Sequence, residues 1–223
     1  MLGGRFLSGL ITAVITAGFA TVGVLPAVAD SATVQYVALG DSYAAGQAAG
    51  SFPNCPHSPN GYPALLDSEQ SIHLRANPTC SGAMTISVAD TQLSALNRGT
   101  RLVTLTVGGA DLDVSGVLTA CTAVPPVDCE DAINDALALL AVPPGGESVL
   151  GGRLTDLYAD ITDAAPKALV VVTGYPHLFS PAPSDPDLAI KLQINAATAA
   201  LNATIQQAVA SRQAQASTLS TLT

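Results

Sequence analysis

The stretch that decides the fold is VQYVALGDSYAAG, which runs from Val34 to Gly46. Its first half is an almost continuous apolar run, which is typical of a strand buried on both faces of a parallel sheet. Gly40 permits a tight turn, and Asp41 or Ser42 can cap a helix that begins with the small residues after Tyr43. Ser42 would then lie at the carboxyl edge of the sheet, where open α/β folds place their sites. These residues alone leave two interpretations of Ser42, a nucleophile or an ordinary capping residue.

The rest of the chain alternates between strand-like and helical patterns. Strands separated by helices imply an α/β fold with a parallel sheet and right-handed crossovers. Apolar runs predict further strands at 72–76, 101–107 and 168–173. Apolar spacing and capping residues predict helices at 63–69, 84–96, 111–120, 131–141, 150–161 and 187–212.

The N-terminal segment resembles a secretory leader. Arg5 is followed by a long apolar run and by Ala27-Val28-Ala29, the small-x-small pattern of a signal peptidase site. We therefore expect a signal peptide at 1–29, a domain at 30–212 and a polar tail at 213–223, with secretion to the extracellular space. The alternative is an uncleaved anchor in the cell envelope, because the apolar run is long enough to span a bilayer.

The charge balance of the chain argues against two classes of partner. Lys and Arg number 8 against 17 Asp and Glu, which gives a formal charge of −9. Arg5 is the one charged residue of the leader, so the chain from Asp30 onward is more acidic still. This balance disfavours nucleic acid and anionic membrane surfaces. We expect no nucleic-acid partner and no stable membrane insertion once the leader is removed.

Four cysteines follow the leader, which fits an oxidising compartment. Three pairings are possible, and we favour Cys55–Cys80 with Cys121–Cys129 because these nearest pairs close loops rich in Pro, Ser and Gly. A zinc site is the alternative, although the chain has no C-x-x-C or H-x-x-x-H spacing. We therefore expect no metal. The acidic residues Asp128, Glu130 and Asp131 are better explained as favourable charge at a helix N-terminus.

Four short blocks appear in an order that resembles the SGNH, or GDSL, hydrolases, and the secreted actinobacterial lipases and esterases in particular. The blocks are Gly40-Asp41-Ser42-Tyr43, Cys80-Ser81-Gly82-Ala83, Val107-Gly108-Gly109-Ala110-Asp111 and Gly174-Tyr175-Pro176. The resemblance implies a flavodoxin-like three-layer α/β/α sandwich that hydrolyses carboxylic esters of small or lipid substrates. It implies no cofactor, and we expect a monomer. Members of the family also carry a disulfide near each of the positions favoured above.

The resemblance assigns roles to three positions. Ser42 would attack the ester carbonyl, and the N–H groups of Ser42 and Gly82 would stabilise the oxyanion. The family's third donor is an Asn side chain, and Ala110 occupies that position here. Losing one such donor typically costs about 10²–10³ in rate. Asp111 keeps the acidic residue of the block, and we interpret it as a capping residue.

The family's general base is a His in an Asp-x-x-His block after a fifth strand, and neither feature follows the long helix here. We therefore expect a C-terminally truncated relative whose sheet lacks its last strand and exposes the apolar edge of 168–173. His177 lies near the correct rim as a substitute base, while His57 is expected at the surface and His73 in a structural role. Two hypotheses follow: an impaired secreted esterase, or a non-catalytic secreted binding protein on the same scaffold.

Overall fold

A computed structural model of the chain describes residues 33–47, 55, 57–123 and 128–221. The expected signal peptide at 1–29 lies outside the described residues. The apolar run that begins at Val34 forms the first strand, as its sequence predicts.

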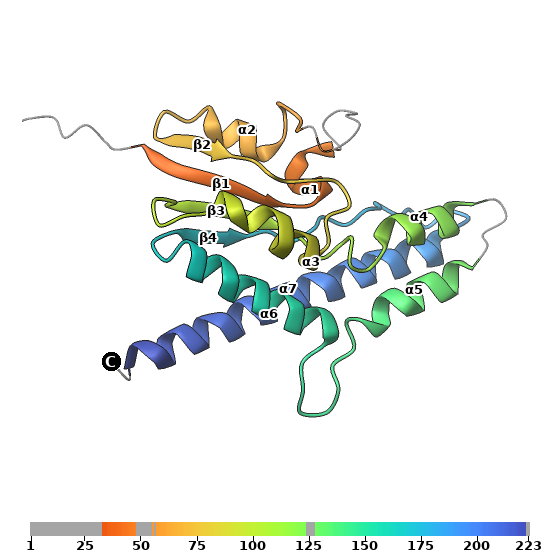
Figure 1. Ribbon diagram of the computed structural model, residues 1–223. Helices are drawn as coiled ribbons and strands as arrows, with labels where there is room; N and C mark the ends of the chain where they lie inside the picture. The colour runs from red at the N-terminus through yellow and green to blue at the C-terminus, as the bar shows by residue number, and fades with distance from the viewer. Residues whose placement is uncertain (1–32, 48–54, 56, 124–127, 222–223) are drawn as a thin grey trace, which may run out of the picture. The chain divides into compact units, whose positions relative to one another are not determined.

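A parallel sheet forms the centre of the domain (Figure 1). Its strands are β1 (Val34–Gly40), β2 (Ile72–Ala76), β3 (Leu102–Thr106) and β4 (Leu169–Val172), in the order β2-β1-β3-β4. The two central strands, β1 and β3, are the most buried. All the strands that the sequence predicts are therefore confirmed.

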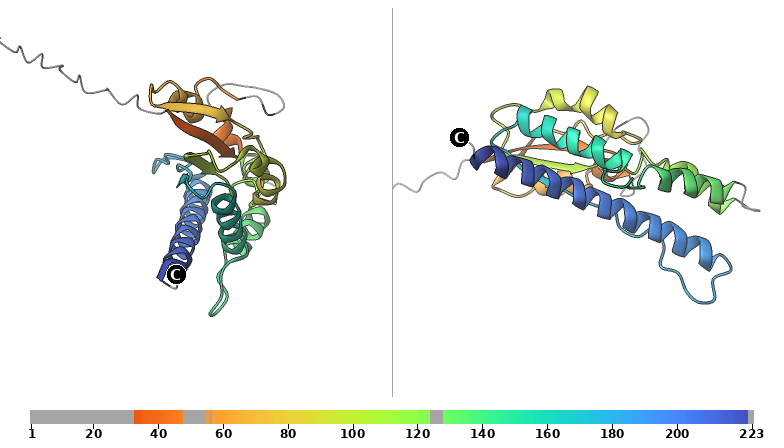
Figure 2. Two further views of the ribbon diagram at one scale, coloured as in Figure 1. Left: turned by 60° about the vertical axis from the view of Figure 1, so that its left-hand side comes forward. Right: turned by 90° about the horizontal axis from the view of Figure 1, so that it is seen from below.

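Helices cover both faces of the sheet, which makes the three-layer α/β/α arrangement. Figure 2 shows α3 and α6 on one face and α2 on the other, while α7 runs beside α6 past the β4 end of the sheet. None of the helices in the described residues is both long and apolar enough to cross a bilayer. Their bounds are α1 Ser42–Ala45, α2 Tyr62–Asp67, α3 Thr85–Ser87, α4 Val114–Thr122, α5 Cys129–Ala138, α6 Val149–Ala164 and α7 Leu188–Thr221.

Two helices differ from their predictions. The regular helix predicted at 84–96 is wrong: α3 is followed by a π-helical turn (Val88–Gln92) and a 3₁₀ turn (Leu93–Ala95). Within this irregular segment the polar Gln92 is buried together with the apolar Val88. Helix α7 continues past Arg212 to Thr221, because the sequence after 187 contains no Gly or Pro to end it. Most of the expected polar tail at 213–223 is therefore helical.

The core lies between the sheet and helix α6. Val37 and Leu39 of β1 and Leu105 of β3 are fully buried, and α6 contributes Leu150 and Leu154 from its predicted apolar face. Helix α7 packs on α6 and closes this side of the core through three further residues, Leu201, Ile205 and Ala208.

Both favoured disulfides are present. Cys55 is bonded to Cys80, and Cys121 is bonded to Cys129 between α4 and α5. All four cysteines are thus oxidised, and no thiolate is left for the alternative zinc site. The first disulfide ties the segment after β2 to the loop after α1, beside the first sequence block.

Strand β4 lies at one end of the sheet, and no described strand pairs with its outer side. The side chains of Leu169 and Val171 are 67% and 38% exposed. The apolar edge expected at 168–173 is therefore confirmed in the described residues, while its pairing with a partner stays a prediction.

Candidate active site

The first sequence block forms the turn from β1 into α1. Gly40 has φ +129°, and a Cβ at this position would lie 2.2 Å from the carbonyl oxygen of Thr106 on β3. Asp41 caps α1, because its Oδ1 accepts a hydrogen bond from the N–H of Tyr43 at 2.9 Å. Of the two possible caps, Asp41 is thus the one used. The hydroxyl of Ser42 has no hydrogen-bond partner among the described residues, at the carboxyl edge of the sheet.

A buried glutamine holds this turn from the π-helical segment. Gln92 is 2% exposed. Its Oε1 accepts a hydrogen bond from the N–H of Gly40 at 2.8 Å, and its Nε2 donates one to the carbonyl of Gly40 at 3.0 Å. The side-chain amide therefore pairs with the Gly40 backbone groups as a neighbouring strand would. Nothing in the sequence marks Gln92 apart from its polarity at a core-facing position.

Tyr175 joins the first block to the third. Its hydroxyl donates to Oδ2 of Asp41 at 2.5 Å and accepts from the N–H of Gly109 at 2.9 Å. Its ring also meets that of Tyr43 edge to face, with centroids 5.1 Å apart. Burial raises the pKa of Asp41 to about 6, against the smaller opposing effect of the Tyr175 hydrogen bond. Burial likewise raises the pKa of the Tyr175 phenol.

Asn202 of helix α7 holds the backbone of Tyr175 through two hydrogen bonds. Oδ1 of Asn202 accepts a hydrogen bond from the N–H of Tyr175 at 2.8 Å, and its Nδ2 donates to the carbonyl of Tyr175 at 2.8 Å. Asn195, two turns earlier, binds the backbone of Phe179 in the same way. Asn202 is the first residue of the sequence Asn-Ala-Thr, and its amide is already used in this pair. The blocks made it possible to expect Tyr175 near the site, but no pattern pointed to either asparagine.

The second block forms a turn at Gly82, which has φ +78°. The N–H of Cys80 donates to the carbonyl of Gly40 at 3.0 Å, so this turn lies directly beside the first. Ser81 Oγ donates to Oε1 of Gln47. The N–H of Gly82 has no partner among the described residues and is available to a ligand.

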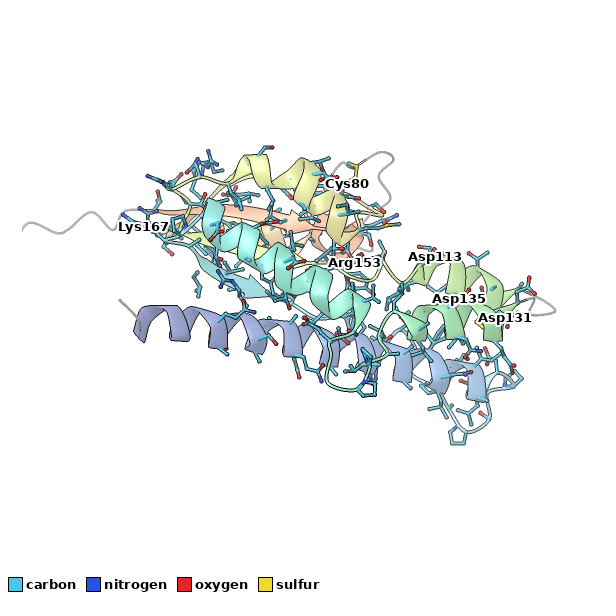
Figure 3. The ribbon with its side chains drawn as sticks, turned by 60° about the horizontal axis from the view of Figure 1, so that its bottom comes forward. Cys80, Asp113, Asp131, Asp135, Arg153 and Lys167 are labelled. Atoms are coloured by element: carbon cyan, nitrogen blue, oxygen red, sulfur yellow. A yellow bond between two sulfur atoms is a disulfide. The ribbon has the colours of Figure 1, made fainter. Side chains whose placement is uncertain are left out.

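In the third block, Ala110 lines a cavity at the carboxyl edge of the sheet, whereas Asp111 is held by Thr85 and Arg153. The carboxylate of Asp111 is buried and accepts hydrogen bonds from the N–H and the hydroxyl of Thr85, at 2.9 and 2.6 Å. Arg153 of α6 lies 3.5 Å from Oδ1 of Asp111, and Figure 3 labels this arginine. Asp111 is therefore not the N-cap of either neighbouring helix, since Met84 precedes α3 and Asp113 precedes α4; it holds the first residue of α3 from a distant part of the chain. Asp113, also labelled in Figure 3, caps α4 itself.

The carboxyl edge of the sheet encloses a cavity of about 290 Å³. Ser42, Gly82 and Ala110 all line it, so the structure brings the three predicted site residues together. The lining contributed by α4 and α7 is mainly aliphatic, and part of it also lines a smaller pocket of about 40 Å³ between α4, α5 and α7. The residues shared by these two spaces are Val114, Leu178, Thr198 and Leu201.

The order of blocks around this cavity agrees with the comparisons to known proteins. A model of the GDSL-like Lipase/Acylhydrolase family matches residues 38–218. The chain belongs to this family. It is 36% identical over 181 residues to Lipase 1 of Streptomyces coelicolor, covering 78% of this chain and 65% of that protein. It is also 36% identical over 148 residues to a lipase of Streptomyces rimosus, covering 65% and 53%. The chain thus spans between about half and two thirds of the length of these curated relatives.

Two solved structures from the family share the fold. The crystal structure of phospholipase A1 from Streptomyces albidoflavus superposes with a TM-score of 0.72 at 35% identity, covering 82% of this chain and 78% of that one. The extracellular lipase from Streptomyces rimosus gives a TM-score of 0.71 at 34% identity, with 81% and 78% covered. The chain therefore has the fold of the actinobacterial lipases that its sequence resembles.

In this GDSL-family chain, no histidine lines the cavity within the described residues. His177 is exposed, although its neighbours Pro176 and Leu178 both line the cavity. Nε2 of His57 is 2.9 Å from the carbonyl of Thr79, and the ring is exposed as expected. His73 is exposed on β2, 3.9 Å from Asp67. His177 as a substitute base stays a prediction, and the described structure gives it no contact with Ser42.

Proposed function

We propose that the protein is a secreted serine hydrolase that cleaves carboxylic esters through Ser42. The observation that carries this proposal is that Ser42 and Gly82 line one cavity, and that neither the hydroxyl of Ser42 nor the N–H of Gly82 has a hydrogen-bond partner among the described residues. Ser42 Oγ would attack the ester carbonyl, and the oxyanion would accept hydrogen bonds from the N–H groups of Gly82 and Ser42. Expulsion of the alcohol and attack of water on the acyl-enzyme would complete the reaction.

The same residues limit the rate that we expect. Ala110 lines the cavity but has no side-chain donor, so one oxyanion hydrogen bond is missing. No histidine is placed to deprotonate Ser42 in the described part of the chain, and a serine hydroxyl is a weak nucleophile at neutral pH without a base. We therefore propose an impaired esterase, whose turnover is slow in comparison with that of its relatives.

The apolar wall of the cavity suggests where the acyl chain would bind. Val114 and Leu118 of α4 face the cavity together with Leu178 and Leu201. An acyl chain along this wall would point from Ser42 into the smaller apolar pocket between the helices. The small volume of that pocket favours short acyl chains.

A fluorophosphonate probe tests the proposal on the purified secreted chain. We expect covalent labelling of Ser42 and slow release of nitrophenol from nitrophenyl butyrate, both lost in Ser42→Ala. Ala110→Asn adds the missing donor, and we expect it to raise esterase activity by about 10²–10³.

If the native chain is neither labelled nor active above Ser42→Ala, the second candidate holds. This is a non-catalytic secreted binding protein, which is favoured by Ala110 and by the absence of a histidine from the described lining of the cavity.

A further inference from the structure

The basic residues of this acidic chain are concentrated at the amino end of the sheet, opposite the cavity. The chain has 8 Lys and Arg residues, of which Arg5 lies outside the described residues. Most of the others lie at this end, and we call them the basic edge: Arg75, Arg98, Arg101, Lys167 and Arg212. We propose that the basic edge binds a linear polymer of phosphate groups. This inference goes beyond the proposed function and does not depend on it.

Hydrogen bonds place the centre of the basic edge at the amino ends of β3 and β4. The carbonyl of Arg101 accepts a hydrogen bond from the N–H of Leu169, so the segments that enter these two strands are neighbours. The guanidinium of Arg101 also donates to the carbonyl of Arg98 at 2.9 Å. Lys167 precedes β4 by one residue, and Figure 3 labels it at this end of the sheet.

The two outer members of the basic edge are held by elements beside these strands. Arg75 of β2 donates from Nη2 to the carbonyl of Ala95, where the 3₁₀ turn before β3 ends. Arg212 of α7 donates from Nη2 to the hydroxyl of Thr162 at 2.7 Å, in the last turn of α6. The cations thus form a row that crosses the sheet from β2 to α7. Three strand spacings separate β2 from β4, which is about 14 Å.

The charges of the basic edge are not neutralised within the described part of the chain. Arg153 lies 3.5 Å from Asp111, and Lys191 lies 3.0 Å from Asp185, so the basic residues elsewhere are paired with carboxylates. The described ion pairs include no member of the basic edge, whose hydrogen bonds go to carbonyls and one hydroxyl. Positive charge also predominates locally, because the acidic residues in the same segments are Asp67, Glu69 and Asp163.

A row of exposed cations suits a repeating anion. Arg98, Arg101 and Lys167 are exposed, so a chain lying across the edge can contact all of them. The planar guanidinium of Arg matches the oxygens of a phosphate. Nucleic-acid bases would add little, because the exposed aromatic ring of the described residues is Tyr43 at the opposite end of the sheet. Helix α7 continues past Arg212 beside the row (Figure 1), so the edge is not flat, which favours a flexible chain over a membrane surface.

The basic edge is far from the candidate nucleophile. Strand β1 runs from the amino end of the sheet to Gly40, and its 7 residues span about 23 Å. This length exceeds the screening length of about 10 Å in 0.1 M salt. A polymer bound at the basic edge would therefore leave the cavity at Ser42 open.

The proposal is tested by titrating the full native chain into fluorescently labelled polyphosphate and measuring anisotropy. We expect binding in 0.1 M NaCl that is lost in 1 M NaCl, where the screening length falls to about 3 Å. The formal charge of the chain, −9, opposes binding of a polyanion anywhere else. No measurable binding in 0.1 M NaCl, or binding that salt does not weaken, overturns the proposal.

Two double variants with the same net charge localise the binding. Arg101→Gln with Lys167→Gln removes two cations from the row, and we expect Kd to rise at least about tenfold. The control Asn134→Asp with Gln193→Glu also lowers the net charge by two, at exposed positions of α5 and the first turns of α7. It should raise Kd by less than about threefold, because these positions lie beyond the screening length. Equal weakening by the two variants, each shown to be folded by thermal unfolding, contradicts the proposal.

Two further ligands distinguish the sources of phosphate. Oligothymidine of similar length should bind no more tightly than polyphosphate, and vesicles of phosphatidylglycerol should not sediment the chain in 0.1 M NaCl. Tighter binding of oligothymidine, or sedimentation with the vesicles, would assign the edge to another class of partner and reject the proposal.

Labelling of Ser42 separates this inference from the proposed function. Saturating polyphosphate should leave the rate of fluorophosphonate labelling unchanged, and a loss of labelling would place the polymer at the cavity and contradict the proposal. If the native chain binds polyphosphate through the basic edge but is never labelled, the esterase is rejected and the basic edge is retained.

Discussion

Gly40 and Gly82 both have positive φ, and both belong to turns beside the candidate nucleophile, but their surroundings differ. A Cβ on Gly40 would overlap the backbone of Thr106, whereas a Cβ on Gly82 would meet no atom within 4 Å. Gln92 binds both backbone groups of Gly40, while no described residue binds the N–H of Gly82. The first turn is thus fixed by packing and hydrogen bonds, and the second keeps a donor free for a ligand.

The difference shows how one cavity can combine two requirements. A nucleophile must be held in one position to attack, which needs many contacts around its turn. An oxyanion donor must remain unpaired until the charge develops, which needs an accessible N–H on a turn anchored elsewhere. Here that anchor is Cys80, through its disulfide and its hydrogen bond to Gly40. Substitutions in the two turns should therefore have effects of different size.

Gly40→Ala should have the largest effect. The added methyl group would overlap the carbonyl of Thr106 in a backbone conformation that Ala rarely adopts, so β1 and β3 would have to separate. We expect a loss of more than about 3 kcal/mol in the free energy of unfolding, measured by urea denaturation followed by circular dichroism. A loss below about 1 kcal/mol would show that the ends of these strands can move apart easily.

Gln92→Leu should come second. The N–H of Gly40 would lose its partner in a buried position, which costs about 1–3 kcal/mol. The same denaturation experiment measures the loss. Gln207→Leu is a matched control at an exposed position of α7 and should change stability by less than about 0.5 kcal/mol. Equal effects of the two substitutions would mean that the Gly40 turn does not depend on this amide.

Asp41→Asn should change the pH dependence of stability. The pKa of Asp41 is raised by burial from 3.8 to about 6, so the folded protein favours the protonated carboxyl. The contribution of this carboxyl is therefore fully present below about pH 4 and is lost as the pH rises through about 6. Relative to the variant, the native chain should lose about 1–3 kcal/mol between pH 4 and pH 7. Urea denaturation at several pH values measures this difference, and parallel curves would contradict it.

Gly82→Ala should have the smallest effect of the four. The new methyl group would meet open space, so only the strain of the left-handed conformation remains, about 1–2 kcal/mol. The N–H is retained, and labelling of Ser42 by the fluorophosphonate should fall by less than about tenfold. A complete loss of labelling in a folded variant would show that the Gly82 turn is as intolerant of change as the Gly40 turn.

The sequence allowed the strands, the order of the blocks and both disulfides to be predicted, because each depends on local patterns. Apolar runs determine which segments become β1 and β3, and Gly40 and Ser42 stand in a recognisable block. Gln92 and Asn202 could not be predicted, since each acts on a backbone group far away in the chain, and a lone amide on a helix carries no directional signal. The irregular turns at 88–95 could not be predicted either, because the apolar spacing of 84–96 also fits a regular helix.

The two asparagines of α7 also constrain how this part of the family can vary. Asn195 and Asn202 lie two helical turns apart and bind the backbone of Phe179 and Tyr175, so the segment after β4 runs antiparallel to the helix. Removing one residue between the asparagines would rotate one of them by about 100° and withdraw it from its partner. Substitutions on the exposed side of α7 would leave both pairs intact. In related chains that keep the two pairs, this stretch of helix should therefore differ in composition but have a constant length.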